Sequence, residues 1–182
     1  MILTAFRREP RNRNIHALYG MIVAQARLPA FYAGHGVPDT VDGRFELIVL
    51  HLVLVLDRLR RDRDDKGSPI GQRLFDTFCR DLDDNLREMG VGDMAVPRRM
   101  RSFGEAFYGR QAAYRAALSA ADERELEKAI SRNIFGIVGV DDKAVPLARY
   151  MRAAARQLDA QEEDLVAAGK AVFPDPEAFF RA

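Results

Sequence analysis

The carboxylates that could do metal chemistry gather in one predicted helix. They are Asp76, Asp81, Asp83 and Asp84. Aspartate-rich helices can hold magnesium and a prenyl diphosphate because hard cations prefer carboxylate oxygens. Asp76 stands four residues before Arg80, however, and Asp83 stands four residues before Arg87. Such pairs on the polar side of a helix favour a solvated ladder of charges. We expect the ladder, with a small magnesium-dependent enzyme acting on a prenyl diphosphate as the alternative.

A second group of polar side chains falls on or beside apolar helical stripes. Its members are His51, Asp81, Asn85 and Arg110. His51 lies in the middle of an apolar segment, and Arg110 lies between Phe107 and Tyr114. A buried polar group needs a hydrogen-bond partner, so these side chains are predicted to form a buried polar cluster. The cluster would be either a polar site inside a helical cleft or a core network that fixes helix register.

Other chemistry finds little support in the residues. A lone histidine such as His51 in an apolar helix is more often a packed core residue than a haem ligand. Cys79 borders an apolar stripe and has no histidine at local spacing. The sequence contains no Gly-x-Ser-x-Gly elbow, P-loop or dinucleotide fingerprint. We therefore expect a protein that is not an enzyme and that uses no cofactor or metal.

Arginine is concentrated in two places. The segment from Pro97 to Arg115 contains Arg98, Arg99, Arg101, Arg110 and Arg115, with Glu105 as its one acid. The N-terminal segment adds Arg7, Arg8, Arg11 and Arg13. Together they could face RNA, a ribosome or acidic lipid heads. The alternative is that these arginines only solvate the surface.

The element that must organise these residues is a predicted helix at about 41–62. Thr40 is a suitable N-cap, and Asp42 favours the positive end of the helix. The stretch from Leu47 to Leu56 carries no charge. It is too short for a membrane span, which needs about 20 apolar residues. A helix that is apolar on every side must be enclosed by others, so we place it at the centre of the fold.

Further apolar stripes predict an all-α protein, a single-domain bundle of six to seven helices. Helices are expected near 14–28, 41–62, 68–89, 97–118, 122–134 and 143–158. Ser68 and Pro69 give the third of these a typical N-cap and first position. We expect a polar basic arm at 1–13, a helical domain at 14–170 and a C-terminal tail at 171–182.

Composition sets the broad class. The chain has 182 residues, 48% hydrophobic and 30% charged, as in an ordinary globular protein. Its net charge of +1 gives no general attraction to nucleic acid such as DNA, or to anionic lipid. One cysteine permits no intramolecular disulfide. The first ten residues lack the apolar region of a signal peptide, so we expect a cytoplasmic bacterial protein that could lie peripherally at the inner membrane.

Three blocks of sequence resemble a known family. They are LYGMIVAQARLPAFYAGHGVPDTVDGRFELIVLHLVLVLDRL, LFDTFCRDLDDNLREMGVGD and FGEAFYGRQAAYRAAL. In order and spacing they are similar to the ubiquinol–cytochrome c chaperone family over roughly residues 17–118. The resemblance implies an all-helical, non-enzymatic assembly factor for respiratory complex III that binds newly made cytochrome b. It also implies a small partner protein and a position near the ribosomal exit, as for the mitochondrial members.

A client-binding surface follows from the same segments. Rigid aromatic side chains and arginine are favoured at binding surfaces. The residues predicted to bind the client are Arg27, Phe31, Tyr32, Arg44, Arg98, Arg99, Arg101 and Tyr108. We expect the loop at 29–45 and the basic start of the helix near 97 to form one surface. A helical adaptor with some other client is the remaining alternative.

Overall fold

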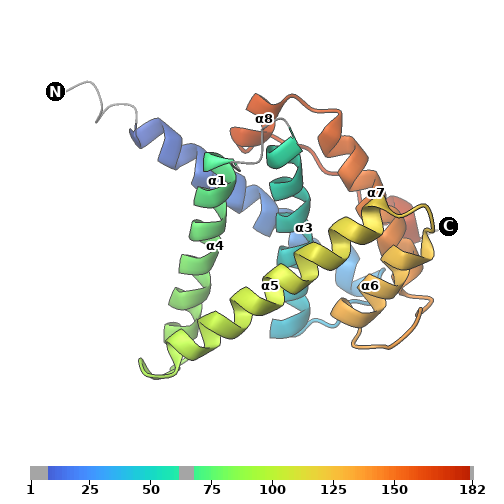
Figure 1. Ribbon diagram of the computed structural model, residues 1–182, viewed down its shortest axis with the longest axis horizontal. Coiled ribbons are helices and arrows are strands. Elements are labelled where there is room, and N and C mark those ends of the chain that lie inside the picture. The colour runs from blue at the N-terminus through green and yellow to red at the C-terminus, as the bar shows by residue number, and fades with distance from the viewer. Residues whose placement is uncertain (1–7, 62–67, 181–182) are drawn as a thin grey trace.

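The computed structural model describes residues 8–61 and 68–180 and shows one helical domain (Figure 1). The described residues form nine helices and no strand: α1 (Arg8–Ala26), α2 (Pro29–Ala33), α3 (Val41–Arg61), α4 (Pro69–Glu88), α5 (Val96–Ser119), α6 (Arg124–Ile134), α7 (Ala144–Asp159), α8 (Glu163–Ala167) and α9 (Glu177–Phe180). The all-α prediction is confirmed. The six long helices are the six expected, and the extra three have only four or five residues each.

The helix α3 is the centre of the core, as predicted. Leu47, Val49, Leu50, Leu52 and Val53 are each 0% exposed. The helix contacts α1, α4, α5, α6, α7 and α8. Its uncharged stretch is therefore covered on all sides by the rest of the chain.

Side-chain caps fix the starts of two helices. The Oγ1 of Thr40 accepts a hydrogen bond from the amide of Gly43 at 3.1 Å, as expected for the N-cap of α3. The Oγ of Ser68 accepts from the amide of Gly71 at 3.2 Å, and Pro69 occupies the first position of α4. Both caps satisfy amides that a helix start leaves without an intrahelical partner.

The long helices lie in two groups around α3. The helices α1 and α4 pack together on one side, and α6 and α7 pack together on the other. Figure 1 shows α5 running from the far end of α4, across α3, to α6. The turn between α4 and α5 thus lies at the edge of the molecule, away from α6 and α7.

Three boundaries differ from the sequence prediction. The helix α1 begins at Arg8 and not at Asn14, so residues 8–13 are not a separate arm, while residues 1–7 lie outside the described residues. Pro29–Ala33 forms the short helix α2 where a loop was expected. The segment predicted as a C-terminal tail contains α9, which packs on α7. The tail is held because its residue Phe173 is buried.

Candidate functional site

Three residues predicted to bind a client meet in one surface pocket. Arg27, Tyr32 and Arg44 line a pocket of about 410 Å³ together with Pro29, Ala33 and Asp39. They come from the residue that follows α1, from α2 and from the first turn of α3. The pocket combines an aromatic ring with cationic side chains at a bend of the chain, which suits a protein-binding site.

Local contacts hold this pocket in shape. The Tyr32 hydroxyl donates to the carbonyl oxygen of Ala26 at 3.0 Å. The Arg44 Nε donates to the Asp39 carboxylate at 2.7 Å, and this exposed ion pair lowers the pKa of Asp39. Burial is the first cause of the raised pKa of Tyr32, so the phenol stays protonated near neutral pH. The pocket therefore presents a neutral ring beside one paired arginine, Arg44, and an exposed Arg27.

Phe31 is not part of this surface, and its prediction as an exposed anchor is wrong. The side chain is 0% exposed. Its ring lies 5.0 Å from the ring of Tyr150 and 5.4 Å from that of His51. The cause is the short helix α2, in which consecutive side chains point about 100° apart. Phe31 consequently enters the core while Tyr32 stays at the surface.

The loop before α3 meets the helix α5 in a second pocket of about 470 Å³. Phe45 of α3 and Phe103 of α5 line it, with ring centroids 5.0 Å apart. The expected proximity of loop and helix is thus present near Phe103. The side chains of Arg98, Arg99 and Arg101 are exposed and lie further along α5 toward the turn that follows α4.

Tyr108 lies on a different side of α5. It is 59% exposed and lines a third pocket, of about 340 Å³, with Phe75 and Phe107. Its position five residues after Phe103 turns it about 140° around a helix, from 100° per residue. Tyr108 therefore points away from the pocket of Phe45 and Phe103, and the residues predicted to bind the client do not share one pocket.

The four residues of the predicted buried polar cluster do not form a single cluster. His51 is buried beside Tyr150, whereas Asp81 is half-buried and accepts from the Tyr19 hydroxyl at 2.7 Å. Asn85 is exposed and donates to the backbone oxygen of Asp81 at 2.6 Å. Asn85 thus lies on the solvated side of α4 and meets neither His51 nor Arg110.

Arg110 has a separate partner. Its Nε donates to one oxygen of the Glu46 carboxylate at 2.5 Å, and its Nη2 donates to the other oxygen of the same carboxylate. Glu46 is 6% exposed, and burial raises its pKa while Arg110 opposes that rise. This bidentate pair ties the first turns of α3 to α5. Sequence reasoning missed Glu46, because an acid at the start of a helix is ordinarily solvated.

A buried hydrogen-bonded chain was also missed. The Gln25 amide donates to the Tyr150 hydroxyl at 3.1 Å, and that hydroxyl lies 2.7 Å from His51 Nε2. His51 Nδ1 lies 2.7 Å from the oxygen of Leu47, which can only accept. The proton of the ring is therefore on Nδ1, and both nitrogens of His51 are engaged. Burial lowers the pKa of His51 to about 4. The side chain behaves as a neutral core histidine.

The carboxylates of α4 do not gather into a metal site. Asp83 pairs with Arg87 at 2.7 Å, as the charge-ladder interpretation predicts, and Asp76 accepts from Gln72 at 2.8 Å. Within residues 8–61 and 68–180, no group of three or more His, Cys, Asp or Glu side chains is placed to hold a metal ion.

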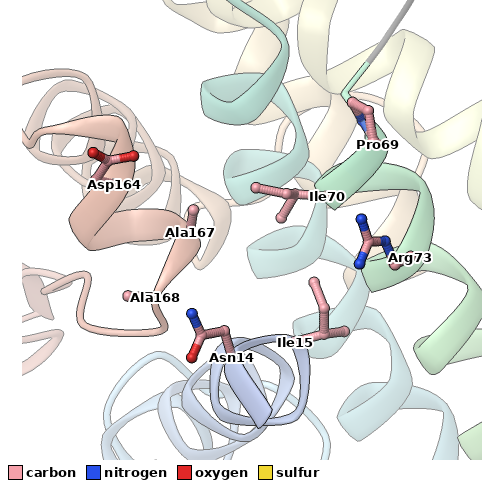
Figure 2. A pocket seen from close by; sticks show the side chains of 8 residues that line it. All are labelled: Asn14, Ile15, Pro69, Ile70, Arg73, Asp164, Ala167 and Ala168. Carbon is pink, nitrogen blue, oxygen red and sulfur yellow. The ribbon is translucent and has the colours of Figure 1, made fainter. Parts of the chain in front are cut away.

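A further pocket, of about 460 Å³, lies between α1, α4 and α8 (Figure 2). Ile15 and Ile70 form apolar parts of its wall. Arg73 of α4 and Asp164 of α8 stand on opposite sides of it.

No helix within the described ranges is long and apolar enough to cross a membrane.

Comparison with known proteins gives a consistent picture. A family model described as ubiquinol-cytochrome C chaperone matches residues 33–173. The crystal structure of the Cbp3 homolog from Brucella abortus is 36% identical in sequence, with a TM-score of 0.84, over 98% of this chain and 99% of that one. No curated protein matches the chain. On the family match and the full-length structural likeness, the chain belongs to the ubiquinol–cytochrome c chaperone family.

Proposed function

We propose that this protein is an assembly chaperone for respiratory complex III and that its client is newly made cytochrome b. The observation that carries the proposal is the family match over residues 33–173. It is supported by the Cbp3 homolog, which resembles this chain over nearly the whole length of both. The protein supplies no covalent chemistry in this role. It shields its client and releases it.

The pocket formed by Arg27, Tyr32 and Arg44 is the proposed centre of the client-binding surface. The neighbouring pocket that contains Phe45 and Phe103 extends it along α5. Aromatic side chains give contact area at little cost in conformational entropy, and arginine pairs with acidic or carbonyl groups of a client. A segment of a membrane protein offers both kinds of partner: apolar side chains in its middle and polar groups at its ends.

The test is genetic and spectroscopic. In a host that makes complex III, deletion of the gene should lower the haem b signal of the membranes and the amount of assembled complex. Restoring the wild-type gene should return both. A deletion strain with unchanged haem b and unchanged complex III would overturn the proposed function. A loss of some other respiratory complex, with complex III intact, would instead favour a helical adaptor with a different client.

The magnesium-enzyme alternative gains no support from Asp81, Asp76 and Asp83, which are engaged by Tyr19, Gln72 and Arg87 respectively. The small partner protein and the place near the ribosomal exit, which the resemblance implies, stay predictions. Capture of partners on tagged protein from the native host would test both. Cytochrome b fragments in the captured material support the proposed client, and their absence from material that contains other membrane proteins contradicts it.

A further inference from the structure

The turn between α4 and α5 presents two methionines to solvent. Met94 is 95% exposed and Met89 is 58% exposed. Figure 1 shows this turn at the edge of the molecule, at the end of the hairpin that α4 and α5 form. Neither side chain contributes to the core. Large apolar side chains gathered at an exposed position mark a contact with an apolar partner.

The turn has a defined backbone, so the exposure of the methionines does not come from a loose loop. Gly90 has a φ of 79°, the left-handed conformation that glycine adopts readily. Its amide donates to the oxygen of Arg87 at 2.9 Å, and the amide of Val91 donates to the oxygen of Leu86 at 3.0 Å. These two bonds are those of a Schellman motif, which satisfies the last carbonyls of a helix.

Side chains hold the same turn from both ends. The Arg87 guanidinium bonds the Asp93 carboxylate at 2.5 Å while it also pairs with Asp83. Leu86 before the turn and Val96 after it are buried. The chain between them is therefore anchored on both sides, and the methionines are carried on a preformed support.

Positive charge borders these methionines. Residues 87–101 contain four arginines and two acids, a net charge of +2. Arg98 and Arg99 are exposed and form no ion pair with any residue in the described ranges. Arg101 is 83% exposed and lies 3.3 Å from Glu105. The outer end of the hairpin thus carries exposed methionines beside two arginines, Arg98 and Arg99, that have no ion pair among the described residues.

We propose that this end of the α4–α5 hairpin, residues 87–101, docks on the surface of a membrane that contains anionic phospholipids. Met89 and Met94 enter the boundary between headgroups and acyl chains, and Arg98 and Arg99 bind lipid phosphates. Methionine suits this role because it is unbranched and adapts to an irregular apolar surrounding. Apolar burial together with attraction to anionic lipid is the usual basis of interfacial binding.

Nucleic acid fits the same surface less well. Single-stranded RNA is bound by stacking of bases on aromatic rings beside basic groups. Residues 87–101 contain no aromatic side chain, and their large exposed apolar side chains are methionines. Docking on a membrane does not depend on which client the protein binds, so failure of one proposal leaves the other standing.

The experiment measures binding of the purified full chain to vesicles by co-sedimentation. Binding is expected to vesicles of phosphatidylglycerol and phosphatidylcholine, to be much weaker on pure phosphatidylcholine, and to fall as salt rises. Arg98→Ala with Arg99→Ala should weaken it about thirtyfold, since each basic residue near an anionic surface contributes about 1 kcal/mol. Met89→Ser with Met94→Ser should weaken it about tenfold or more.

Matched controls come from exposed residues elsewhere. Arg149→Ala with Arg156→Ala removes two exposed arginines of α7, and Val138→Ser changes a side chain that is 97% exposed. Both should leave vesicle binding unchanged, and all variants should keep the wild-type melting temperature. Equal loss in the controls overturns the proposal. Equal binding of the wild type to both kinds of vesicle also overturns it. So does a Met89→Ser, Met94→Ser variant that binds vesicles as tightly as the wild type. Binding of ribosomal RNA that needs the arginine pair, with no vesicle binding, assigns the surface to RNA instead.

Discussion

The hydroxyl oxygen of Tyr150 lies 2.7 Å from Nε2 of His51 and links α7 to the central helix α3. Because His51 donates its own proton to Leu47, its Nε2 accepts the proton of the tyrosine hydroxyl. The same hydroxyl accepts from Gln25 of α1. One buried hydroxyl therefore connects three helices that come together only in the folded protein.

Replacing Tyr150 by phenylalanine should destabilise the protein. The change removes the donor to His51 Nε2 and leaves that buried nitrogen without its partner, at a cost of about 1–3 kcal/mol in the free energy of unfolding. Urea unfolding followed by circular dichroism measures it. Tyr108→Phe is the control, because Tyr108 is 59% exposed and should change stability little. Equal effects of the two substitutions would show that the Tyr150–His51 bond does not stabilise the fold.

The elements of this fold are set by local patterns that a sequence displays. The uncharged stretch in α3, the cap at Thr40 and the Ser68–Pro69 start of α4 all predict their helices correctly. The helix α2 was missed because its five residues are too few to show a helical period. That error is what placed Phe31 at the surface in the sequence prediction.

The partners of the polar residues could not be predicted, because they depend on packing between distant segments. Tyr19 and Asp81 are 62 positions apart, Glu46 and Arg110 are 64 apart, and His51 and Tyr150 are 99 apart. An apolar stripe on a predicted helix shows that its residues face other helices. It does not show which residue of the other helix each of them contacts. The sequence therefore indicated that His51 and Arg110 need partners without identifying those partners.

Stability should fall with acidification because of His51. Its pKa is near 6.5 when unfolded and about 4 when folded, so the unfolded state binds the proton more readily. The stability that the fold gains from the lowered pKa of His51 is fully present above pH 6.5 and is lost as the pH falls toward 4. It amounts to about 2 kcal/mol between pH 6.5 and pH 5, at 1.36 kcal/mol per pH unit. The lowered pKa of His35 acts in the same direction.

The measurement compares urea unfolding at pH 7 and pH 5 for the wild type and for His51→Gln. The raised pKa of Glu46 has the opposite effect, stabilising the protein at low pH, but it is common to both proteins. The difference between their pH responses therefore isolates His51. If the variant loses as much stability on acidification as the wild type, the buried neutral histidine is not the cause.

The ion pair of Glu46 and Arg110 should be costly to break from one side. Arg110→Ala leaves the Glu46 carboxylate buried without its partner, and breaking a buried pair in this way costs about 3–5 kcal/mol. Since Arg110 is partly exposed, we expect the lower end of that range. Arg101→Ala breaks an exposed pair and should cost less than about 1 kcal/mol. The double variant Glu46→Gln, Arg110→Ala should recover part of the loss, and no recovery would argue against this explanation.

Gly43 should not tolerate a methyl group. A Cβ placed there would lie 2.0 Å from the carbonyl oxygen of Pro38, a backbone atom that cannot move aside alone. Gly43→Ala should therefore destabilise the protein, although alanine is the better helix former. Gly104→Ala in α5 is the matched control, since no atom lies within 4 Å of its Cβ position. That change should stabilise by up to about 1 kcal/mol. Thermal unfolding of the two variants should give shifts of opposite sign.

Capture of the proposed client should depend on Tyr32 and not on Phe31. If Tyr32 is buried against the client, its loss removes about 1.5–3 kcal/mol of binding, which is about a tenfold to hundredfold weaker capture. Tyr32→Ala should therefore reduce co-purification of cytochrome b while the melting temperature changes modestly, because one hydrogen bond to Ala26 is lost. Phe31→Ala should lower stability by about 3–5 kcal/mol, as for any buried phenylalanine.

Tyr108→Ala separates a general loss of aromatic surface from a loss at this pocket, because Tyr108 belongs to α5 and lines a different pocket. Unchanged capture by Tyr108→Ala together with reduced capture by Tyr32→Ala would support the pocket of Arg27, Tyr32 and Arg44. The reverse result would move the client to the pocket that contains Phe75 and Tyr108. Arg27→Ala tests the charged part of the same pocket. Its capture of the client is measured at low and at high salt. An exposed arginine acts mainly on the rate of encounter, so the effect of the substitution should fade as salt rises. An effect of Arg27→Ala that is the same at both salt concentrations would mean that the side chain is desolvated against the client and not merely steering it.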